Sequence, residues 1–155
     1  GVVVPANYNS PGQVVISGSP EAVESVMDSA KASGARMTVQ LNVSGAFHSP
    51  LMAPAREALA DSLDSLEISD SLFPIFTNVD AKPVTKGNDI KDSLIRQLEN
   101  PVLWSKSILS MKESGIESFI EVGPGKVLQG LNKRIDRKTS CQGVESFEQV
   151  ENFNV

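Results

Sequence analysis

Short strand-like and helix-like stretches alternate along this chain, and glycine or proline separates most of them. Residues 13–18 are rich in β-branched side chains and end at Gly18, which is typical of a strand. Ser19, Pro20 and Glu21 then supply an N-cap, a proline at the first helical position and an early acid, and together they predict the start of a helix. Alternation of this kind favours an α/β or mixed α/β layered fold over a helix bundle or a β-sandwich.

The spacing of apolar residues predicts the remaining elements. After Pro20, apolar side chains recur at intervals of three and four, which indicates an amphipathic helix that ends at Gly34. Residues 37–43 alternate apolar and polar side chains, a period of two that predicts a half-buried strand. The same patterns predict helices at about 50–65, 88–98, 103–114 and from 126 onward, strands at 73–79 and 119–122, and a short edge or turn segment at 82–84. From about Thr139 the pattern dissolves, so residues 139–155 are predicted to be a loose tail or a partner-dependent segment.

Charge and composition exclude several classes of protein. The chain has 155 residues, and its 14 Lys and Arg against 19 Asp and Glu give a formal net charge of −5 at pH 7. This negative charge argues against nucleic acid as the main partner. Hydrophobic residues make up 40% of the chain, so it can bury a core, and its length is that of one domain. No apolar run approaches the roughly 18 residues that a membrane span needs, so no membrane is expected as a partner.

Two residue types that bind metals or form crosslinks occur only once. Cys141 has no partner for an intrachain disulfide, and with His48 as the single histidine the chain cannot build a zinc site from soft ligands, so no metal is expected. The first charged residue is Glu21, so the N-terminus lacks the positive start of a signal peptide and the Arg-rich pattern of a transit peptide. These features favour a reducing compartment, the cytoplasm or the interior of a plastid or mitochondrion.

His48 is the first candidate for a catalytic base. It lies in a loop of small residues between an expected strand and an expected helix, where open α/β sheets usually keep their sites. A helix N-terminus just beyond it would disfavour the imidazolium and keep the ring able to accept a proton. The alternative is a loop histidine held by a backbone hydrogen bond. The sequence contains no Gly-x-Ser-x-Gly elbow that would expose a nucleophile, and Ser49 is better suited to cap the next helix.

Three polar features each have a functional and a structural interpretation. The turn 123–126 could cradle an anion with its backbone amides, but it fails the dinucleotide and P-loop patterns, so a tight turn packing a helix on a sheet is favoured. The stretch 126–138 carries a local net charge of +4, which could dock an acidic partner or could be solvated cations at a helix end. Asn7, Asn9 and Gln13 crowd a turn at the chain start, and they could serve that turn or bind a polar ligand.

Four ordered motifs resemble the malonyl-CoA:acyl carrier protein transacylase family. They are, as they stand in this sequence, NYNSPGQVVISG at 7–18, AFHSPLM at 46–52, QLENPV at 97–102 and EVGPGKVL at 121–128. The resemblance covers about residues 2–138 and implies the C-terminal portion of an acyltransferase domain. Residues 1–43 would form part of a small ferredoxin-like (α+β) subdomain, residues 44–138 the C-terminal part of an α/β-hydrolase-like large subdomain, and residues 139–155 an unmatched tail.

The resemblance implies a ping-pong transfer of a malonyl group in fatty acid biosynthesis. In this family a serine attacks the thioester of malonyl-CoA while a histidine takes its proton, and the phosphopantetheine thiol of acyl carrier protein then attacks the acyl-serine. His48 matches the histidine, and the main-chain carbonyl of Gln97 would accept the second ring N–H and fix the tautomer. The substrates are malonyl-CoA and phosphopantetheinylated acyl carrier protein, and no cofactor is implied.

The resemblance also suggests residues for substrate binding. Phe47 matches a position that accompanies malonyl preference, because its ring would crowd an α-methyl branch. Gly45 departs from the histidine often found there in polyketide acyltransferases, which favours the fatty-acid enzyme. The residues implied for the acyl pocket are Asn7, Asn9, Gln13 and Val127, and those expected to dock the carrier protein are Lys126, Lys133 and Arg134.

The family's serine elbow, oxyanion-hole residues and malonyl-binding arginine have no match in this chain and would lie before Gly1. The isolated chain is therefore predicted to be inactive and to require the N-terminal half of the same enzyme, without which it would expose apolar surface and unpaired strand edges. Two alternatives remain. The chain could be a non-catalytic half that binds carrier protein or a complementary half, or it could be a fragment of the acyltransferase domain of a polyketide or fatty acid synthase.

Overall fold

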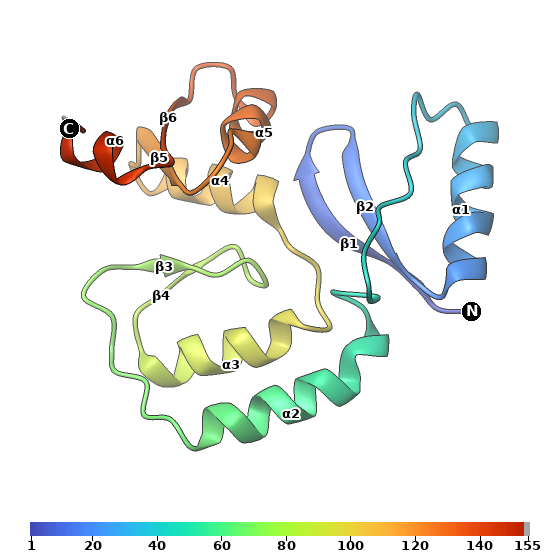
Figure 1. Cartoon of the computed structure of the whole chain (residues 1–155), viewed down its shortest axis with the longest axis horizontal. Helices are drawn as coiled ribbons and strands as arrows, with labels where there is room; N and C mark the ends of the chain where they lie inside the picture. Colours follow the sequence, from blue (N-terminus) through green and yellow to red (C-terminus); the bar gives the residue numbers. More distant parts are fainter. Residues whose placement is uncertain (154–155) are drawn as a thin grey trace.

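The N-terminal part of the chain is a β-hairpin followed by a helix (Figure 1). The computed structural model describes residues 1–153. Strands β1 (Val3–Ser10) and β2 (Gln13–Gly18) pair antiparallel, and helix α1 (Pro20–Ala32) packs beside β2. The predicted strand at 13–18 and the helix after Ser19 are confirmed. The hydroxyl of Ser19 does not cap the helix but points to the carbonyl oxygen of Val2 at 3.4 Å.

The strand predicted at 37–43 is wrong. These residues form no strand, and the apolar members of the pattern are open to solvent, with Met37 78% and Val43 62% exposed. A strand needs a neighbour to satisfy its backbone N–H and C=O groups, and none of residues 1–153 pairs with this segment. The sequence does alternate, but the described part of the chain supplies no neighbouring strand for this segment.

The middle of the chain is a pair of helices with a two-stranded ribbon. The short 3₁₀ helix η1 (Pro50–Met52) leads into α2 (Ala53–Asp64), which packs against α3 (Gly87–Gln97). Between these helices, β3 (Ile75–Phe76) and β4 (Pro83–Val84) pair antiparallel. The strand predicted at 73–79 is therefore shorter than expected, and the segment predicted at 82–84 is confirmed as a short strand.

The C-terminal part corrects the prediction of a loose tail. After α4 (Trp104–Glu113), strand β5 (Ser118–Val122) is joined through α5 (Val127–Ile135) to β6 (Ser140–Val144), and α6 (Phe147–Glu151) follows. β5 and β6 pair in parallel. Parallel strands need a connection of about a dozen residues or more, usually a helix, and residues 123–139 with α5 provide it. The sequence does not predict β6, because this strand reads Ser-Cys-Gln-Gly-Val and has almost no apolar pattern. Its conformation is determined by backbone pairing with β5. The last two residues of the predicted tail, 154–155, lie outside the described part.

A small core joins the hairpin to the C-terminal part. β1 contacts α4 and α5, and an isolated bridge pairs Asn7 with Val102. At its centre the indole Nε1 of Trp104 donates to Oδ1 of Asn132 at 3.1 Å, and the Nδ2 of Asn132, a residue only 2% exposed, points to the sulfur of Cys141 at 3.6 Å. The mixed α/β class expected from the sequence is confirmed, and the side chain of Asn132, the buried amide in this core, is paired.

Much apolar surface is left uncovered. Within residues 1–153 the buried apolar residues are six, Ala6, Val79, Ala81, Ile108, Leu131 and Val144, whereas 22 large apolar side chains are exposed. Monomeric proteins bury most such side chains when they are contiguous. The exposed apolar surface is consistent with the expectation that further polypeptide covers part of this chain.

A close backbone approach fixes the start of α3. A Cβ added at Gly87 would lie 1.8 Å from the carbonyl oxygen of Ile68, so Gly87→Ala is expected to lower the free energy of unfolding by about 3 kcal/mol. The matched control is Gly130→Ala in α5, where an added Cβ meets no atom within 4 Å and helix propensity predicts a gain of about 0.5–1 kcal/mol. Urea unfolding midpoints test both variants, and equal shifts would contradict the close approach.

Candidate active site

His48 lies in a turn between the segment 37–43 and η1, and its backbone is in the left-handed region. Its φ is +61°, a region that residues other than glycine rarely adopt, and its backbone N–H donates to the carbonyl oxygen of Leu98 at 3.0 Å. The next residue, Ser49, is fully buried, and its hydroxyl donates to the Ala46 carbonyl at 2.6 Å and accepts from the Leu51 N–H. Ser49 is therefore a helix cap, as predicted, and not a partner of the imidazole.

The imidazole of His48 meets the main chain of Gln97. Its Nδ1 lies 2.9 Å from the Gln97 carbonyl oxygen. A carbonyl can only accept, so Nδ1 carries the proton of the neutral ring and Nε2 keeps a free lone pair. The side-chain Nε2 of Gln97 donates to the Asn100 carbonyl at 2.9 Å and lies farther from Nδ1, at 3.4 Å, so the shorter contact of Nδ1 is the one to the main-chain carbonyl. The ring is thus oriented as a base that would accept a proton at Nε2.

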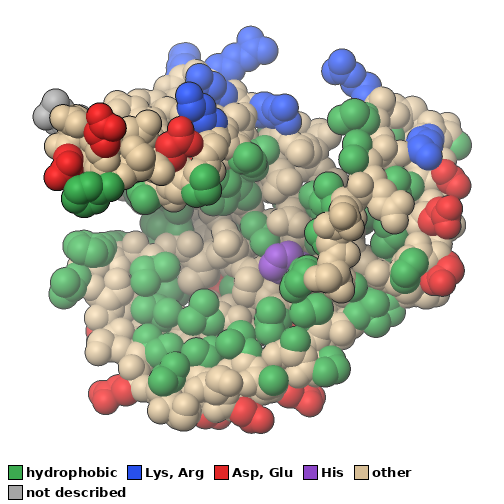
Figure 2. Space-filling view, viewed as in Figure 1, with side chains coloured by type: hydrophobic (Ala, Val, Ile, Leu, Met, Phe, Trp, Pro, Cys, Tyr) green, Lys and Arg blue, Asp and Glu red, His purple; other side chains and the backbone are tan. Residues whose placement is uncertain are grey.

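Two helix ends adjoin His48. Its ring contacts the last residue of α3, where a helix dipole is negative, and η1 begins two residues after it in the chain. Figure 2 shows the single histidine in a hollow near the centre of one face, bordered by apolar side chains.

The residues expected to bind substrate come from separate elements. Asn7 and Asn9 are half-buried on β1, Phe47 is 43% exposed beside His48, and Val127 at the start of α5 is 71% exposed. Within residues 1–153 neither asparagine hydrogen-bonds to the imidazole. Gln13 instead accepts a hydrogen bond from the Arg134 guanidinium at 2.8 Å.

Two carboxylates occupy the turn that the sequence suggested as an anion cradle. Glu121 of β5 accepts from the backbone N–H groups of Leu128 and Gln129 at 2.9 and 3.2 Å. Glu145 accepts from the Gly125 N–H at 2.9 Å. The hydrogen bond from Leu128 is the main reason why the pKa of Glu121 is below its usual range. These amides are already satisfied, which favours the tight-turn interpretation. An acid two residues before this glycine turn was the signal that sequence reasoning overlooked.

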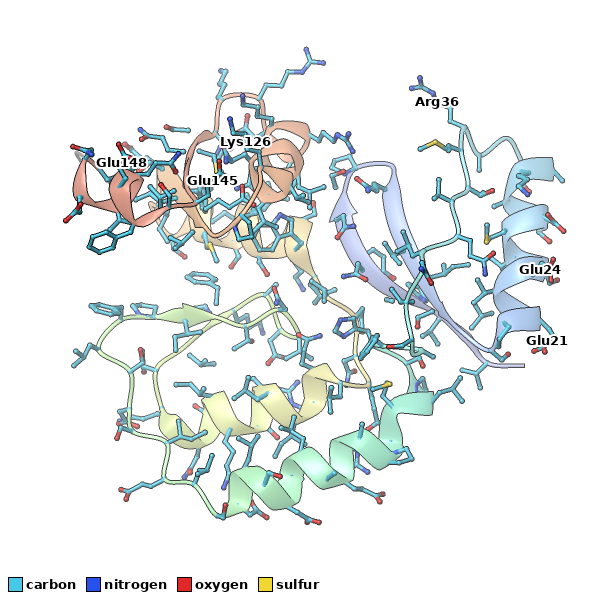
Figure 3. All side chains as sticks on the ribbon, viewed as in Figure 1. Glu21, Glu24, Arg36, Lys126, Glu145 and Glu148 are labelled. Atoms are coloured by element: carbon cyan, nitrogen blue, oxygen red, sulfur yellow. The ribbon has the colours of Figure 1, made fainter. Side chains whose placement is uncertain are left out.

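The cations expected to dock a carrier protein gather around α5. Lys126 projects from the loop between β5 and α5, near Glu145 (Figure 3). The members of this basic cluster, all exposed, are Lys126, Lys133, Arg134, Arg137 and Lys138. None of them forms an ion pair with a carboxylate of residues 1–153, and Asp136, the acid in their midst, pairs with Lys112 of α4. The cluster is therefore available to an acidic partner.

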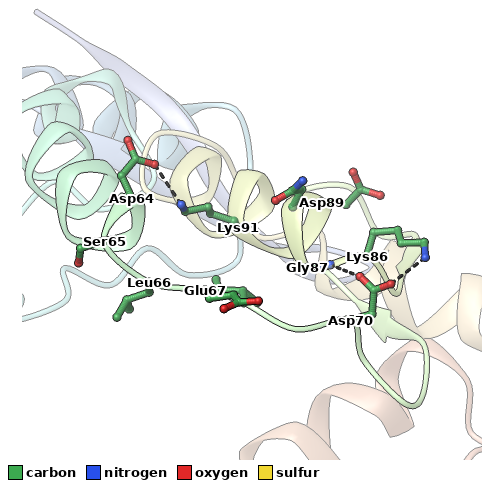
Figure 4. Close-up of a pocket in the computed structure, with 11 residues that line it drawn as sticks. Asp64, Ser65, Leu66, Glu67, Asp70, Lys86, Gly87, Asp89 and Lys91 are labelled. Carbon is green, nitrogen blue, oxygen red and sulfur yellow. Dashed lines mark hydrogen bonds and ion pairs between the residues drawn. The ribbon is translucent and has the colours of Figure 1, made fainter.

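A hollow of about 790 Å³ lies away from His48, between the end of α2 and the start of α3 (Figure 4). Four of its charged groups already pair with one another, Asp64 with Lys91 at 3.1 Å and Asp70 with Lys86 at 2.7 Å. Asp70 also accepts from the Gly87 N–H, and the bond from Lys86 is the main cause that lowers the Asp70 pKa. The carboxylate of Asp70 thus serves the start of α3.

Among residues 1–153 no three His, Cys, Asp or Glu side chains converge as metal ligands would. In the same range, every helix is too short or too polar to cross a bilayer.

Sequence comparison matches residues 1–150 to a family described as "Acyl transferase domain". The chain is 45% identical over 146 residues to a Bacillus subtilis protein named malonyl CoA-acyl carrier protein transacylase, covering 94% of this chain and 46% of that protein. It is 50% identical over 134 residues to an Escherichia coli K12 protein of the same name, covering 86% and 43%. The chain thus spans about half the length of these relatives.

Solved structures agree with the sequence matches. A Vibrio cholerae acyl carrier protein S-malonyltransferase superposes with a TM-score of 0.92 at 43% identity, over 97% of this chain and 49% of that one. A malonyl-transacylase solved in complex with a type II PKS acyl-carrier protein superposes with a TM-score of 0.91 at 41% identity, over the same shares. The match over residues 1–150, supported by fold and identity, shows that this chain belongs to the acyl transferase domain family.

Proposed function

We propose that this chain supplies the general base and part of the acyl pocket for transfer of a malonyl group from malonyl-CoA to acyl carrier protein. The observation that carries the proposal is the hydrogen bond from His48 Nδ1 to the Gln97 carbonyl, which leaves Nε2 free as a base. The relatives named as malonyl transacylases support the substrate. The acyl carrier protein bound to one structural neighbour supports the partner.

The proposed reaction uses His48 twice. In the first half, Nε2 takes the proton of a serine hydroxyl as that oxygen bonds to the malonyl carbonyl carbon, and the imidazolium returns the proton to the departing coenzyme A sulfur. In the second half, Nε2 takes the proton of the phosphopantetheine thiol as the sulfur attacks the acyl-serine, and the proton then goes to the serine oxygen. The Gln97 carbonyl holds Nδ1–H throughout and orients the ring.

A second polypeptide segment must supply the serine in this proposal. No hydroxyl of residues 1–153 hydrogen-bonds to the His48 ring, whose partners are both in Gln97. The exposed apolar side chains, Met37 and Val43 among them, offer a surface for such a segment. We call this chain together with a serine-bearing N-terminal segment of the same family the assembled enzyme.

The finer division of the fold is also a proposal. Residues 1–43, which contain the hairpin and α1, would be part of a ferredoxin-like subdomain, and residues 44–138 part of an α/β-hydrolase-like one. The helix packing beside the hairpin supports the first assignment. The parallel β5–α5–β6 unit supports an α/β arrangement in the second region and extends it past residue 138.

The pocket residues fit the same proposal. Asn7 and Asn9 are half-buried on β1, Gln13 bonds to Arg134 of α5, and Val127 begins α5. In this proposal they contact the malonyl group or its neighbours. Phe47 stacks over Gly45, where an added Cβ would lie 3.5 Å from its ring. The ring would limit branching at the α-carbon of the acyl group.

The test is a transfer assay on the assembled enzyme with malonyl-CoA and phosphopantetheinylated acyl carrier protein. Intact mass should show one malonyl group on the carrier and, before the carrier is added, one on the serine-bearing segment. A carrier that stays unmodified while the enzyme is folded would reject the proposed function.

Charge reversal in the basic cluster tests carrier docking. Lys133→Glu is expected to slow transfer to the acidic carrier by about tenfold and to weaken its salt dependence, with less effect on malonyl-CoA hydrolysis. Adding Arg134→Glu should slow it further, but that variant also loses the bond to Gln13. The charge-matched control is Lys31→Glu, within α1, combined with Arg36→Glu, which lies beyond the hairpin from α5 (Figure 3). Equal losses in cluster and control variants, or in transfer and hydrolysis, would exclude a docking role.

A further inference from the structure

The turn between β3 and β4 anchors both ends of the segment 96–103, which hydrogen-bonds to His48. At one end, the Asp80 carboxylate accepts two hydrogen bonds from the Arg96 guanidinium, Nη1 to Oδ1 at 3.0 Å and Nη2 to Oδ2 at 2.6 Å. At the other end, the carbonyl oxygen of Asn78 accepts from the Leu103 N–H at 2.8 Å. A paired fork of this kind fixes both distance and orientation.

The segment between these two anchors carries both acceptors used by His48. The Gln97 carbonyl meets the imidazole Nδ1, and the Leu98 carbonyl meets the His48 backbone N–H. Arg96 directly precedes Gln97, so the direction of the Gln97 carbonyl depends on where the last turn of α3 is held. A side-chain bond closes this turn, because Asn100 Nδ2 donates to the Arg96 carbonyl at 2.7 Å.

The turn that provides these anchors is itself well fixed. Val79 is 8% exposed and Ala81 is 1% exposed, and the Ala81 N–H donates to the Thr77 carbonyl at 2.8 Å. Ala81 adopts a φ of +55°, which is unusual for an alanine and is tolerated where the surroundings hold the backbone. The hydrogen bonds from Arg96 are the main cause that lowers the pKa of Asp80, so its carboxylate is charged at neutral pH.

We infer that Asp80 and Arg96 are positioning residues for the catalytic base. Their ion pair links the buried β3–β4 turn to the end of α3 and thereby aims the Gln97 carbonyl at Nδ1 of His48. The inference rests on the proposed function, in which that carbonyl fixes the tautomer of the base. Neither residue touches the imidazole in this arrangement; both act through Gln97.

The chain offers a matched control on the same guanidinium. Asp92 accepts from Arg96 Nε at 2.6 Å, but it lies one turn earlier on α3 itself and is 63% exposed, so it does not connect the helix to the turn. Asp80→Asn places an amide N–H against the guanidinium N–H groups and breaks the fork while keeping the shape of the side chain. Asp92→Asn changes the same charge and leaves the link to the turn intact.

The experiment compares the two variants in the assembled enzyme. Asp80→Asn is expected to lower kcat between about tenfold and a hundredfold, as a small misplacement of a catalytic group does, with KM for malonyl-CoA within about twofold. Asp92→Asn should keep kcat within about twofold. Arg96→Lys keeps the charge but not the planar fork, so its kcat should fall between those of the two asparagine variants.

A second readout separates positioning from mere stability. With ¹⁵N-labelled histidine and assigned His48 ring signals, the unchanged protein should show Nδ1 protonated and Nε2 not, and Asp80→Asn should show a mixture of both tautomers at the same pH. If Asp80→Asn lowers both kcat and the denaturant concentration at the unfolding midpoint while the His48 tautomer stays the same, the role of Asp80 is structural and the inference is overturned. It is equally overturned if kcat is unchanged.

These outcomes are distinct from failure of the proposed function. If removal of the His48 ring leaves turnover intact, the proposed function fails. If that removal abolishes turnover but Asp80→Asn behaves like Asp92→Asn, the function stands and only the positioning inference fails.

Discussion

Replacement of His48 by alanine is expected to lower the kcat of malonyl transfer in the assembled enzyme by about 10³-fold or more. Loss of a general base commonly removes two to four orders of magnitude, and loss of a histidine that acts as a unit with a serine can remove more. Both half reactions should slow, because the same Nε2 takes a proton first from the serine and then from the carrier thiol. Rapid-mix measurement of serine acylation and of transfer to the carrier checks the two steps separately.

His48→Asn separates the chemical role of the residue from its structural one. Asparagine tolerates a φ near +61° better than alanine does, and its Nδ2–H can donate to the Gln97 carbonyl in place of Nδ1–H. The variant therefore keeps the hydrogen bond and the turn but has no atom that can take a proton at the position of Nε2. It should unfold at the same denaturant concentration as the unchanged protein and be as inactive as His48→Ala. If His48→Asn retains turnover, His48 is a loop histidine held by the backbone and not the base.

The isolated 155-residue chain is expected to transfer no malonyl group above the background rate. The hydroxyl nearest to His48 in sequence, that of Ser49, is buried. It donates to the Ala46 carbonyl and accepts from the Leu51 N–H. A base without a nucleophile and without donors for the developing oxyanion lacks the two largest sources of rate in acyl transfer. Adding the serine-bearing segment should restore transfer by several orders of magnitude.

The measurement is intact mass of the chain after incubation with malonyl-CoA, with and without that segment. Suppose that a malonyl adduct forms at a single residue of this chain alone, and that none forms when the chain is unfolded by heat before incubation. Such an adduct would reveal a nucleophile within the chain and contradict the prediction. If the isolated chain binds acyl carrier protein but gains no adduct, and addition of the segment restores nothing, the chain is better described as a binding module. The observation that supports this second function is the exposed basic cluster around α5, whose members form no ion pair with a carboxylate of residues 1–153.

The contact between His48 and Gln97 shows a limit of reasoning from side chains. The loop position of His48 made it a candidate base, but the acceptor is a main-chain carbonyl, and every residue has one. Only the resemblance to a known family pointed to Gln97. The carbonyl reaches the ring because α3 ends at residue 97 and because the turn from Asn78 to Ala81 holds that end in place. Neither condition leaves a pattern near His48.

Helices and turns were predictable because their causes are local. A proline at the first helical position, apolar spacing of three and four, and the glycines that adopt positive φ at positions 34 and 115 act within a few residues of one another. The helices α1, α4 and α5 and the strands β2 and β5 therefore lie where the sequence predicts them.

Strand formation and the chemistry of the site depended on tertiary structure. The alternating segment 37–43 forms no strand without a neighbour, whereas the polar segment 140–144 forms one because β5 lies beside it. By itself, the sequence determined the local elements, the mixed α/β class and the likeness to acyl transferases. Tertiary structure alone decided which backbone groups pair, which carboxylates satisfy the start of α5 and which carbonyl orients His48. The reason is physical: these contacts join residues far apart in the chain, and their hydrogen bonds form only where packing brings both partners together.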